Sequence, residues 1–235
     1  MRKIQLKQVL RNKRFVLFTI ILPIGWYIFF DQLQKGVSPS ILLGIAVFIG
    51  VIGNSLATFS KRIASDIGFY SFESHFTSYS VKHYLWDQSI VQLILNSLIF
   101  LAVLVVAVLG FHFPVTTSLL VQFFLLSLMG IYFSVIGFVL GVRIDAKTID
   151  TIGFPVIILA AMTIIPFDTL GASGGFMDLV GKLQRVFPGY YYTKLIQDLT
   201  EKQTIDATQL ALFVAVFGLN LLFFYLLVPK GKMGN

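Results

Sequence analysis

The chain has 235 residues, of which 57% are hydrophobic and only 12% are charged. Soluble domains carry about 25% charged residues, so this composition excludes an ordinary water-soluble domain. The net charge of +7 comes from 18 Lys and Arg against 11 Asp and Glu, and the lack of cysteine excludes disulfides and thiolate metal sites.

Six apolar stretches dominate the sequence, and each is close to the ~20 residues that a helix needs to cross a bilayer. None of them contains Asp, Glu, Lys, Arg or His. Lipid offers the backbone no hydrogen-bond partner, so such stretches form helices or closed barrels, and the period-two alternation of barrel strands is absent. The sequence predicts an all-α polytopic membrane protein with one transmembrane domain over residues 1–235. The spans are expected at about 15–30, 40–59, 89–109, 119–140, 151–167 and 207–228.

The basic residues predict the orientation of the spans. Thirteen lie before the first span, in the second-to-third and fourth-to-fifth connections and after the sixth span, whereas five lie in the other connections. Lys and Arg are enriched in cytoplasmic loops, so both termini are predicted to be cytoplasmic. A basic segment leads into the first span as in a secretory signal, but no small-residue cleavage site follows Phe30. We interpret this span as a retained anchor.

The N-terminal segment, residues 1–14, mixes apolar residues with six cations. This pattern predicts a helix that lies along the cytoplasmic face of the membrane. A positively charged flank that only sets topology is the alternative.

The longest predicted cytoplasmic connection covers residues 60–88 and is unusually aromatic. Disordered linkers have few aromatic residues, so we expect short helices that lie under the membrane or bind a soluble partner. Helical extension of the two flanking spans is the alternative.

The connection between the fifth and sixth spans, residues 168–204, carries an amphipathic pattern. Apolar residues recur at i, i+3, i+4 and i+7 between Phe176 and Phe187. A glycine-rich turn over residues 171–175 precedes this pattern, and Pro188 and Gly189 end it. The prediction is an external helical hairpin, either resting at the outer interface as a cap or dipping back into the membrane as a gate.

Small and polar residues within the spans predict close helix contacts. The second span carries Asn54, Ser55 and Thr58, which suit either the midline of a dimer or packing inside one bundle. The same alternatives apply to Gln92, Asn96, Ser134 and Asn220 in the later spans. The fourth span repeats small residues at Gly130, Ser134, Gly137 and Gly141, for which helix packing is favoured. Pro155 and Pro166 predict a kinked or short fifth helix.

This order of segments resembles the permease subunit of ABC exporters of the ABC-two class, over nearly the whole chain. The cytoplasmic segment of such permeases carries an acidic residue followed closely by glycine, matched by Asp66 and Gly68, although glutamate is commoner at that position. A proline after the fifth span and a second before the last helix are matched by Pro166 and Pro188. The resemblance implies a cytoplasmic coupling helix and a re-entrant-like hairpin before the last span.

The resemblance also implies site residues with three roles. Contact with the ATPase is expected from Arg62, Asp66, Gly68, Phe69, Tyr70, Phe72, Glu73 and Phe76. The substrate path or dimer midline is expected at Asn54, Ser55, Thr58, Pro155 and Thr163. The external gate is expected at Pro166, Phe176, Leu179, Leu183 and Pro188.

No phosphate-binding GxxxxGK[ST] loop occurs in the chain, so the chain is not expected to be an enzyme. The resemblance therefore places ATP and Mg²⁺ on a separate ATPase subunit, with a second permease copy or a sister permease completing the pathway. The expected cargo is hydrophobic or amphipathic, a peptide, drug or lipid-like molecule, and the expected location is a bacterial plasma membrane. Nucleic-acid binding is not implied.

Three other functions were weighed. An ion-coupled secondary transporter normally needs ionisable side chains at mid-membrane, and the predicted spans have none. A metal-dependent membrane enzyme has only His75, His83 and His112 to draw on, at no familiar zinc spacing. A non-catalytic immunity or scaffold protein is the third.

Overall fold

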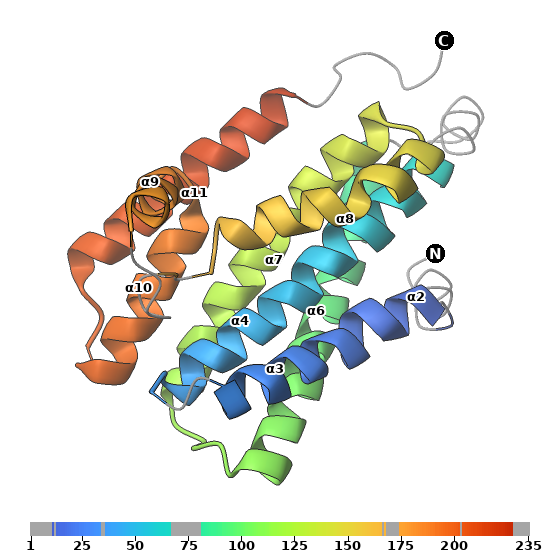
Figure 1. Cartoon of the computed structure of the whole chain (residues 1–235). Coiled ribbons are helices and arrows are strands. Elements are labelled where there is room, and N and C mark those ends of the chain that lie inside the picture. The colour runs from blue at the N-terminus through green and yellow to red at the C-terminus, as the bar shows by residue number, and fades with distance from the viewer. Residues whose placement is uncertain are drawn as a thin grey trace.

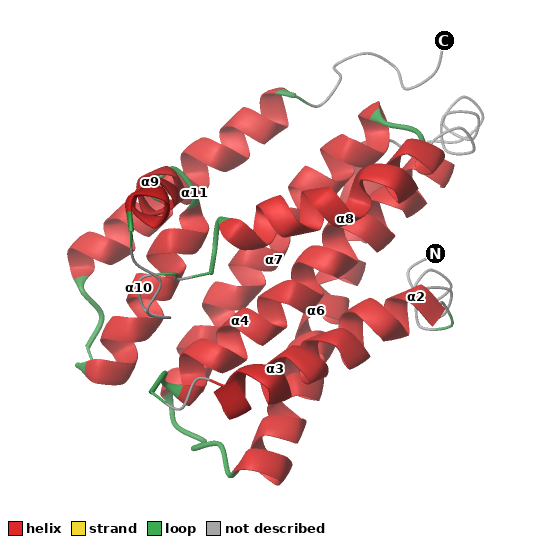
Figure 2. Ribbon diagram, in the orientation of Figure 1, coloured by secondary structure: helices red, strands yellow, loops and turns green. Residues whose placement is uncertain are grey.

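The computed structural model describes residue 11 and residues 13–33, 36–66, 81–165, 167, 174–202 and 204–227. Within these ranges the chain is almost entirely helical and has no strand (Figures 1 and 2). The all-α prediction is confirmed for this part of the chain. Most of the predicted interfacial helix and residues 67–80 of the predicted coupling segment lie outside the described residues.

The first helix runs without a break through α2 (Lys13–Val16), the π-helical η1 (Leu17–Ile21) and α3 (Leu22–Leu33). The second begins as α4 (Pro39–Ile52), winds as a π-helix in η2 (Gly53–Phe59) and continues to Asp66. The remaining elements are α6 (Val81–Phe111), α7 (Ser118–Arg143), α8 (Ala146–Met162), α9 (Gly175–Gln184), α10 (Pro188–Glu201) and α11 (Ala207–Leu226).

Four of the described helices are long and apolar enough to cross a membrane. They cover Pro39–Asp66, Asp87–Phe111, Ser118–Arg143 and Ala207–Leu226. The first three contain the second, third and fourth predicted spans, and the last covers the sixth predicted span except for its final two residues. The first and fifth predicted spans correspond to shorter helices, the apolar segment Thr19–Leu33 and α8. These helices are those of a membrane protein.

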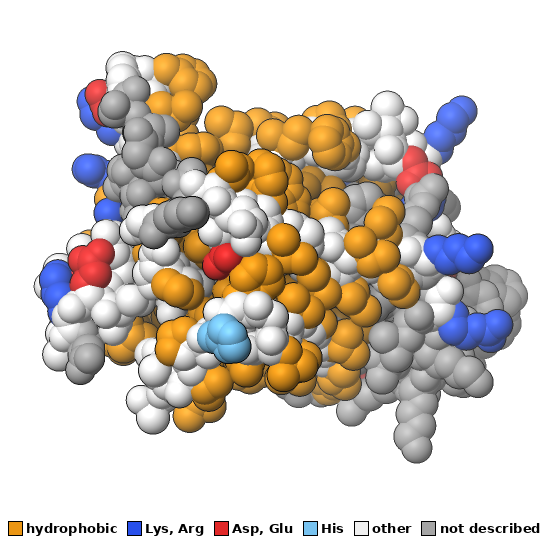
Figure 3. Space-filling model, turned by 60° about the horizontal axis from the view of Figure 1, so that its bottom comes forward, with side chains coloured by type: hydrophobic (Ala, Val, Ile, Leu, Met, Phe, Trp, Pro, Cys, Tyr) orange, Lys and Arg blue, Asp and Glu red, His pale blue; other side chains and the backbone are white. Residues whose placement is uncertain are grey.

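One end of the bundle, here called the Arg143 end, is where α2 begins and where α7 and α11 end (Figure 1). It carries Lys61, Arg62, Arg143 and Lys147. Figure 3 shows hydrophobic side chains over the middle of one face, with Lys and Arg gathered at two opposite edges. This distribution fits an apolar band between two polar surfaces.

The α4 helix is the centre of the fold. Helices α3, α6, α7, α8 and α10 all contact it, and every residue from Ile41 to Ile52 is buried. A helix that is apolar on all sides, as α4 is, is stable only when surrounded by protein or lipid. At the other extreme, α11 packs mainly on α10 and α7 and leaves Leu219 66% exposed.

Glycines allow α7 to lie against η2. A Cβ atom at Gly137 would overlap the backbone carbonyl oxygen of Ser55, and one at Gly141 would overlap that of Ser60. A Cβ atom at Gly130 would overlap the amide of Asn96 on α6. The packing interpretation of these small residues is confirmed within one chain.

The α8 helix begins and ends five residues earlier than the predicted span 151–167. Asp145 fixes its start by accepting hydrogen bonds from the backbone N–H groups of Lys147 and Thr148, at 3.0 and 2.9 Å. The hydrogen bond from the Thr148 hydroxyl, followed by those from the backbone, lowers the pKa of Asp145. Pro155 lies inside a helix that continues to Met162.

Substituting Gly137 tests the contact between α7 and η2. We expect Gly137→Ala to destabilise the bundle by about 1–3 kcal/mol, because the new methyl group meets backbone that cannot rotate away. Gly218→Ala on α11 is the matched control, since a Cβ atom there meets nothing within 4 Å. Thermal unfolding in detergent, followed by size-exclusion chromatography, should show a lower midpoint for Gly137→Ala alone. Equal midpoints would contradict this packing.

Candidate functional site

The C-terminal end of α8 packs against the hairpin formed by α9 and α10. Ile164 is 2% exposed there. Gln184, the last residue of α9, donates hydrogen bonds from Nε2 to the carbonyl oxygens of Met162 and Ile165, at 2.6 and 2.8 Å. The Thr193 hydroxyl of α10 donates to the carbonyl oxygen of Ile164 at 3.2 Å. The α9–α10 hairpin thus caps α8 and supplies the partners that an apolar environment lacks.

The turn of the same hairpin is bound to the middle of α11. Asn220 Nδ2 donates to the carbonyl oxygen of Val186 at 3.0 Å, and its Oδ1 accepts from the Tyr132 hydroxyl of α7 at 3.3 Å. Asn220 is the fourteenth residue of α11, about 20 Å along the helix at 1.5 Å per residue. The hairpin turn therefore contacts α11 about 20 Å from the first residue of that helix.

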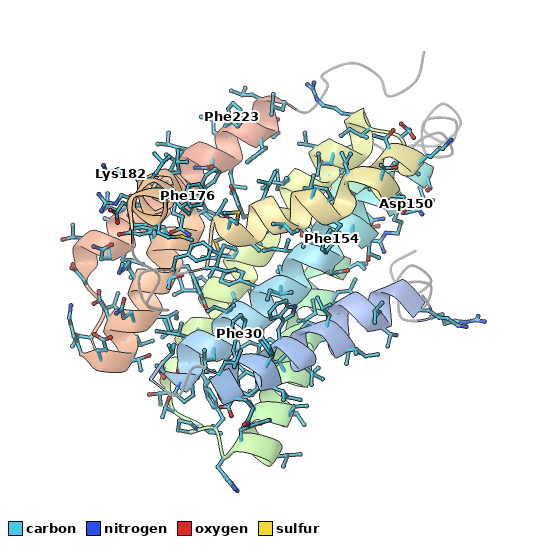
Figure 4. All side chains as sticks on the ribbon, viewed as in Figure 1. Phe30, Asp150, Phe154, Phe176, Lys182 and Phe223 are labelled. Atoms are coloured by element: carbon cyan, nitrogen blue, oxygen red, sulfur yellow. The ribbon has the colours of Figure 1, made fainter. Side chains whose placement is uncertain are left out.

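The apolar stripe predicted for α9 lies mostly on its outward side. Val180 and Gln184 face the protein, whereas Phe176, Leu179 and Leu183 are 66%, 54% and 58% exposed. Figure 4 shows Lys182 pointing away from the bundle. Gly174 begins the helix at φ 128, a conformation that glycine adopts readily, so the glycine-rich turn has a local reason.

At the Arg143 end, side chains connect the helices. Arg62 donates to Gln88 Oε1 at 2.7 Å, which joins the end of the α4 helix to α6. Lys61 forms an ion pair with Asp150 of α8, the residue labelled at this end in Figure 4. Arg143 of α7 donates to the carbonyl oxygen of Leu227, just beyond α11, at 2.6 and 2.9 Å.

Buried polar side chains form a seam between η2, α6 and α7, in the half of the bundle nearer the Arg143 end. Gln92 Nε2 donates to Ser55 Oγ at 3.1 Å, and Ser134 Oγ donates to the carbonyl oxygen of Gly130 at 2.6 Å. Among the described residues, every buried polar residue is uncharged: Thr19, Asn54, Ser55, Ser60, Gln88, Gln92, Asn96, Gln122, Ser134, Gln184 and Thr193.

The residues predicted for ATPase contact are only partly described. Arg62 and Asp66 lie on the extension of the α4 helix, and residues 81–88 extend α6, so helical extension holds at both ends of the connection. The other predicted contact residues lie outside the described residues: Gly68, Phe69, Tyr70, Phe72, Glu73 and Phe76.

The residues predicted for the path or midline are spread over the fold. Asn54 and Ser55 are 1% and 0% exposed inside the chain's own bundle, the second of the two alternatives left open by the sequence. Thr58 is half-buried, Pro155 is exposed on α8, and Thr163 donates to the carbonyl oxygen of Ala160 at the end of α8.

The residues predicted for the external gate belong to the hairpin. Phe176, Leu179 and Leu183 lie on α9, and Pro188 is the buried first residue of α10. Pro166 lies outside the described residues. The sequence analysis did not identify Gln184, which binds the hairpin to the end of α8. Its position as a lone amide beside an apolar stripe could have indicated this role.

The comparisons with known proteins add nothing to this geometry. No protein-family model, curated protein or solved structure matches the chain.

Removing the Gln184 amide tests how the hairpin is held. We expect Gln184→Leu to remove the side-chain partner of the Met162 carbonyl oxygen and to leave that of Ile165 with only the Phe167 N–H, at a cost of about 1–3 kcal/mol of local stability. Hydrogen–deuterium exchange should become faster in residues 175–201. Gln197→Leu on α10 is the matched control, because Gln197 bonds only to the nearby Lys194 and Glu201 side chains in the described structure. Unchanged exchange in Gln184→Leu would show that the hairpin is held otherwise.

Proposed function

We propose that this chain is the permease subunit of an ABC exporter of the ABC-two class. It couples ATP hydrolysis by a separate ATPase subunit to the outward transport of hydrophobic or amphipathic cargo. ATP and Mg²⁺ bind to that partner, and this chain hydrolyses no nucleotide. Its location is a bacterial plasma membrane, with both termini in the cytoplasm and six membrane spans formed by the first helix, the α4 helix, α6, α7, α8 and α11.

The observation that carries the proposal is the hairpin inserted between the fifth and sixth long helices. Its hydrogen bonds to α8 and to the middle of α11 support a re-entrant element, which the resemblance places before the last span. A rigid attachment to two helices lets a tilt of either one move the hairpin. This is what an external gate needs.

Charges on the hairpin support a polar path beside it. Lys182 is exposed on α9, and the Arg185 guanidinium lies 5.9 Å from the centre of the Tyr190 ring. Cations at membrane depth are costly unless they face water or another protein. In the proposed exporter, Lys182 and Arg185 face the transport path.

The Arg143 end is the proposed docking side for the ATPase. There Arg62 and Lys61 connect the α4 helix to α6 and α8, so force applied to the 67–80 segment reaches three helices at once. The uncharged interior of the described helices fits a machine whose energy comes from a partner. An ion-coupled carrier is the competing outcome of the test.

The test is recovery of an ATPase. The affinity-tagged full chain, solubilised from its native membranes in mild detergent, should bring down a soluble polypeptide with a phosphate-binding loop and ATPase activity. The double variant Arg62→Ala, Asp66→Ala should lower that recovery severalfold. The double variant Asp198→Ala, Lys202→Ala is the control, because it removes an ion pair from the α10 end without touching the docking side.

Two results would reject the exporter. One is no ATPase recovery from any of the three chains, whereas equal recovery from all three would remove only Arg62 and Asp66 from the docking contact. The other is substrate transport by the purified chain alone, driven by an imposed ion gradient without nucleotide, which would identify a secondary transporter.

A second permease copy is proposed to pack on the exposed face of α8. Phe154, Ile158 and Leu159 are 69%, 45% and 65% exposed there, an apolar surface on the fifth helix of the predicted midline. The α6 helix also packs on α4, as α8 does. An exposed position on α6 therefore serves as the control for the proposed dimer contact on α8. The buried Asn54 and Ser55 take no part in this contact.

Single cysteines test this interface directly, because the chain has none of its own. In native membranes under mild oxidation, Phe154→Cys should give a disulfide-linked dimer. Leu101→Cys, at an exposed position of α6, should remain monomeric. Cross-linking at Leu101 and none at Phe154 would move the interface to α6.

A further inference from the structure

A cavity of about 170 Å³ opens between α6, α7 and α11 near the Arg143 end. Gln92 and Asn96 of α6 and Ser134 of α7 provide its polar floor. Its walls are mostly apolar and include Leu93, Val135 and Phe138, with Tyr225 of α11 at the rim, 68% exposed. The cavity therefore combines hydrogen-bonding side chains with mostly apolar walls.

The floor holds polar atoms that are buried without partners. Gln92 and Asn96 are 1% and 4% exposed. Gln92 Oε1 and both Asn96 Nδ2 and Oδ1 have no hydrogen bond among the described residues. An unpaired buried polar group costs about 1–3 kcal/mol, so three in one place call for an explanation.

Neighbouring residues fix the two amide side chains that line the cavity. Ser55 Oγ accepts from Gln92 Nε2, which leaves the Gln92 oxygen for another donor. Ser55 belongs to the π-helical η2, a kind of irregularity that is frequent at functional sites. Gly130 leaves the space that the Asn96 amide fills, since any larger residue there would overlap it.

The unpaired atoms define the ligand by complementarity. Two acceptors and one amide donor match a group that both donates and accepts hydrogen bonds, such as a hydroxyl or a carboxamide. Among the described residues, none that lines the cavity is charged, so an ionised group would enter without a counter-charge from them, at a cost of several kcal/mol. The apolar walls match an aliphatic or aromatic body.

We propose that this cavity binds a neutral amphiphile with a hydroxyl or carboxamide head, which enters sideways from the adjacent membrane leaflet. The head binds Gln92 and Asn96, and the apolar body passes Val135 and Tyr225 into the lipid. A volume of about 150 Å³ accepts a benzene-sized group, so the cavity has room for the head and the first few carbons. The site stands on this geometry alone and does not depend on the proposed export function.

The test uses a photoactivatable octanol that bears a diazirine, with the diazirine octane that lacks the hydroxyl as its partner probe. The full chain is reconstituted in phosphatidylcholine nanodiscs and illuminated, and the labelled residues are identified by mass spectrometry. We expect the octanol probe to label the walls around Leu93 and Val135 saturably, at least about fivefold above the octane probe. Excess octanol should displace it, whereas octanoate and octyltrimethylammonium should not.

Two variants remove the site in different ways. Asn96→Ala deletes the principal head contact, and Val135→Trp fills the entrance without changing the floor. Each should reduce labelling at least about fivefold. Ser97→Ala is the matched control on α6, because the Ser97 hydroxyl bonds to the carbonyl oxygen of Leu93 and does not line the cavity. Retention of the wild-type size-exclusion profile shows that the variants are folded.

Several outcomes would overturn the proposal. Equal labelling by the two probes would mean that the hydroxyl head is not recognised. Labelling that persists in Val135→Trp would place the probe elsewhere on the lipid-facing surface. Displacement by either charged octyl compound would show that the head need not be neutral.

Discussion

The structure depends on hydrogen-bond partners for the carbonyl groups at the end of α8, which have no partners within that helix. In an apolar environment each unsatisfied carbonyl group would cost several kcal/mol. The Gln184 amide and the Thr193 hydroxyl satisfy them from two different helices of the hairpin. The end of α8 at Met162 therefore requires the hairpin, because the hairpin supplies the hydrogen-bond donors.

That requirement extends to α11 and to α7. The Asn220 side chain holds the hairpin turn and is itself held by the Tyr132 hydroxyl, so three helices and the hairpin share one hydrogen-bonded cluster. Around it, α4 is surrounded by protein while α11 is largely exposed. The polar seam under η2 lies nearer the Arg143 end, where Gly137 and Gly141 bring α7 against the π-helical segment. The fold thus separates a region that anchors the hairpin from one that offers unpaired hydrogen-bonding groups.

The long helices were predictable because apolar length and the absence of charge are strong signals on their own. The boundaries of α8 were not, since its start depends on hydrogen bonds to Asp145 and its end on Gln184, which is 22 residues from Met162 in sequence. The sequence left open whether the apolar stripe of α9 rests at the outer interface or dips into the membrane. In the structure Phe176 and Leu183 face outward, whereas Gln184 faces in and its amide meets backbone carbonyl groups.

The polar residues of the candidate site show the same limit. Asn54 and Gln92 were visible in the sequence as polar groups within apolar stretches. A single sequence does not show whether they face a partner copy or their own bundle. The answer depended on which helix is central, and that in turn depended on the packing of five neighbours around α4. Only the folded chain shows that Gln92 and Asn96 keep atoms unpaired.

The depth of the hairpin turn is the most direct test of this account. Single cysteines at Val186, Leu219 and Thr204, each carrying a bimane fluorophore in bilayers, can be quenched by lipids brominated at defined chain positions. The account predicts that labels at Val186 and Leu219 are quenched most by the same deep bromine position, and that the label at Thr204 is quenched weakly. A Val186 label that behaves like the Thr204 label would place the hairpin outside the membrane and contradict the account.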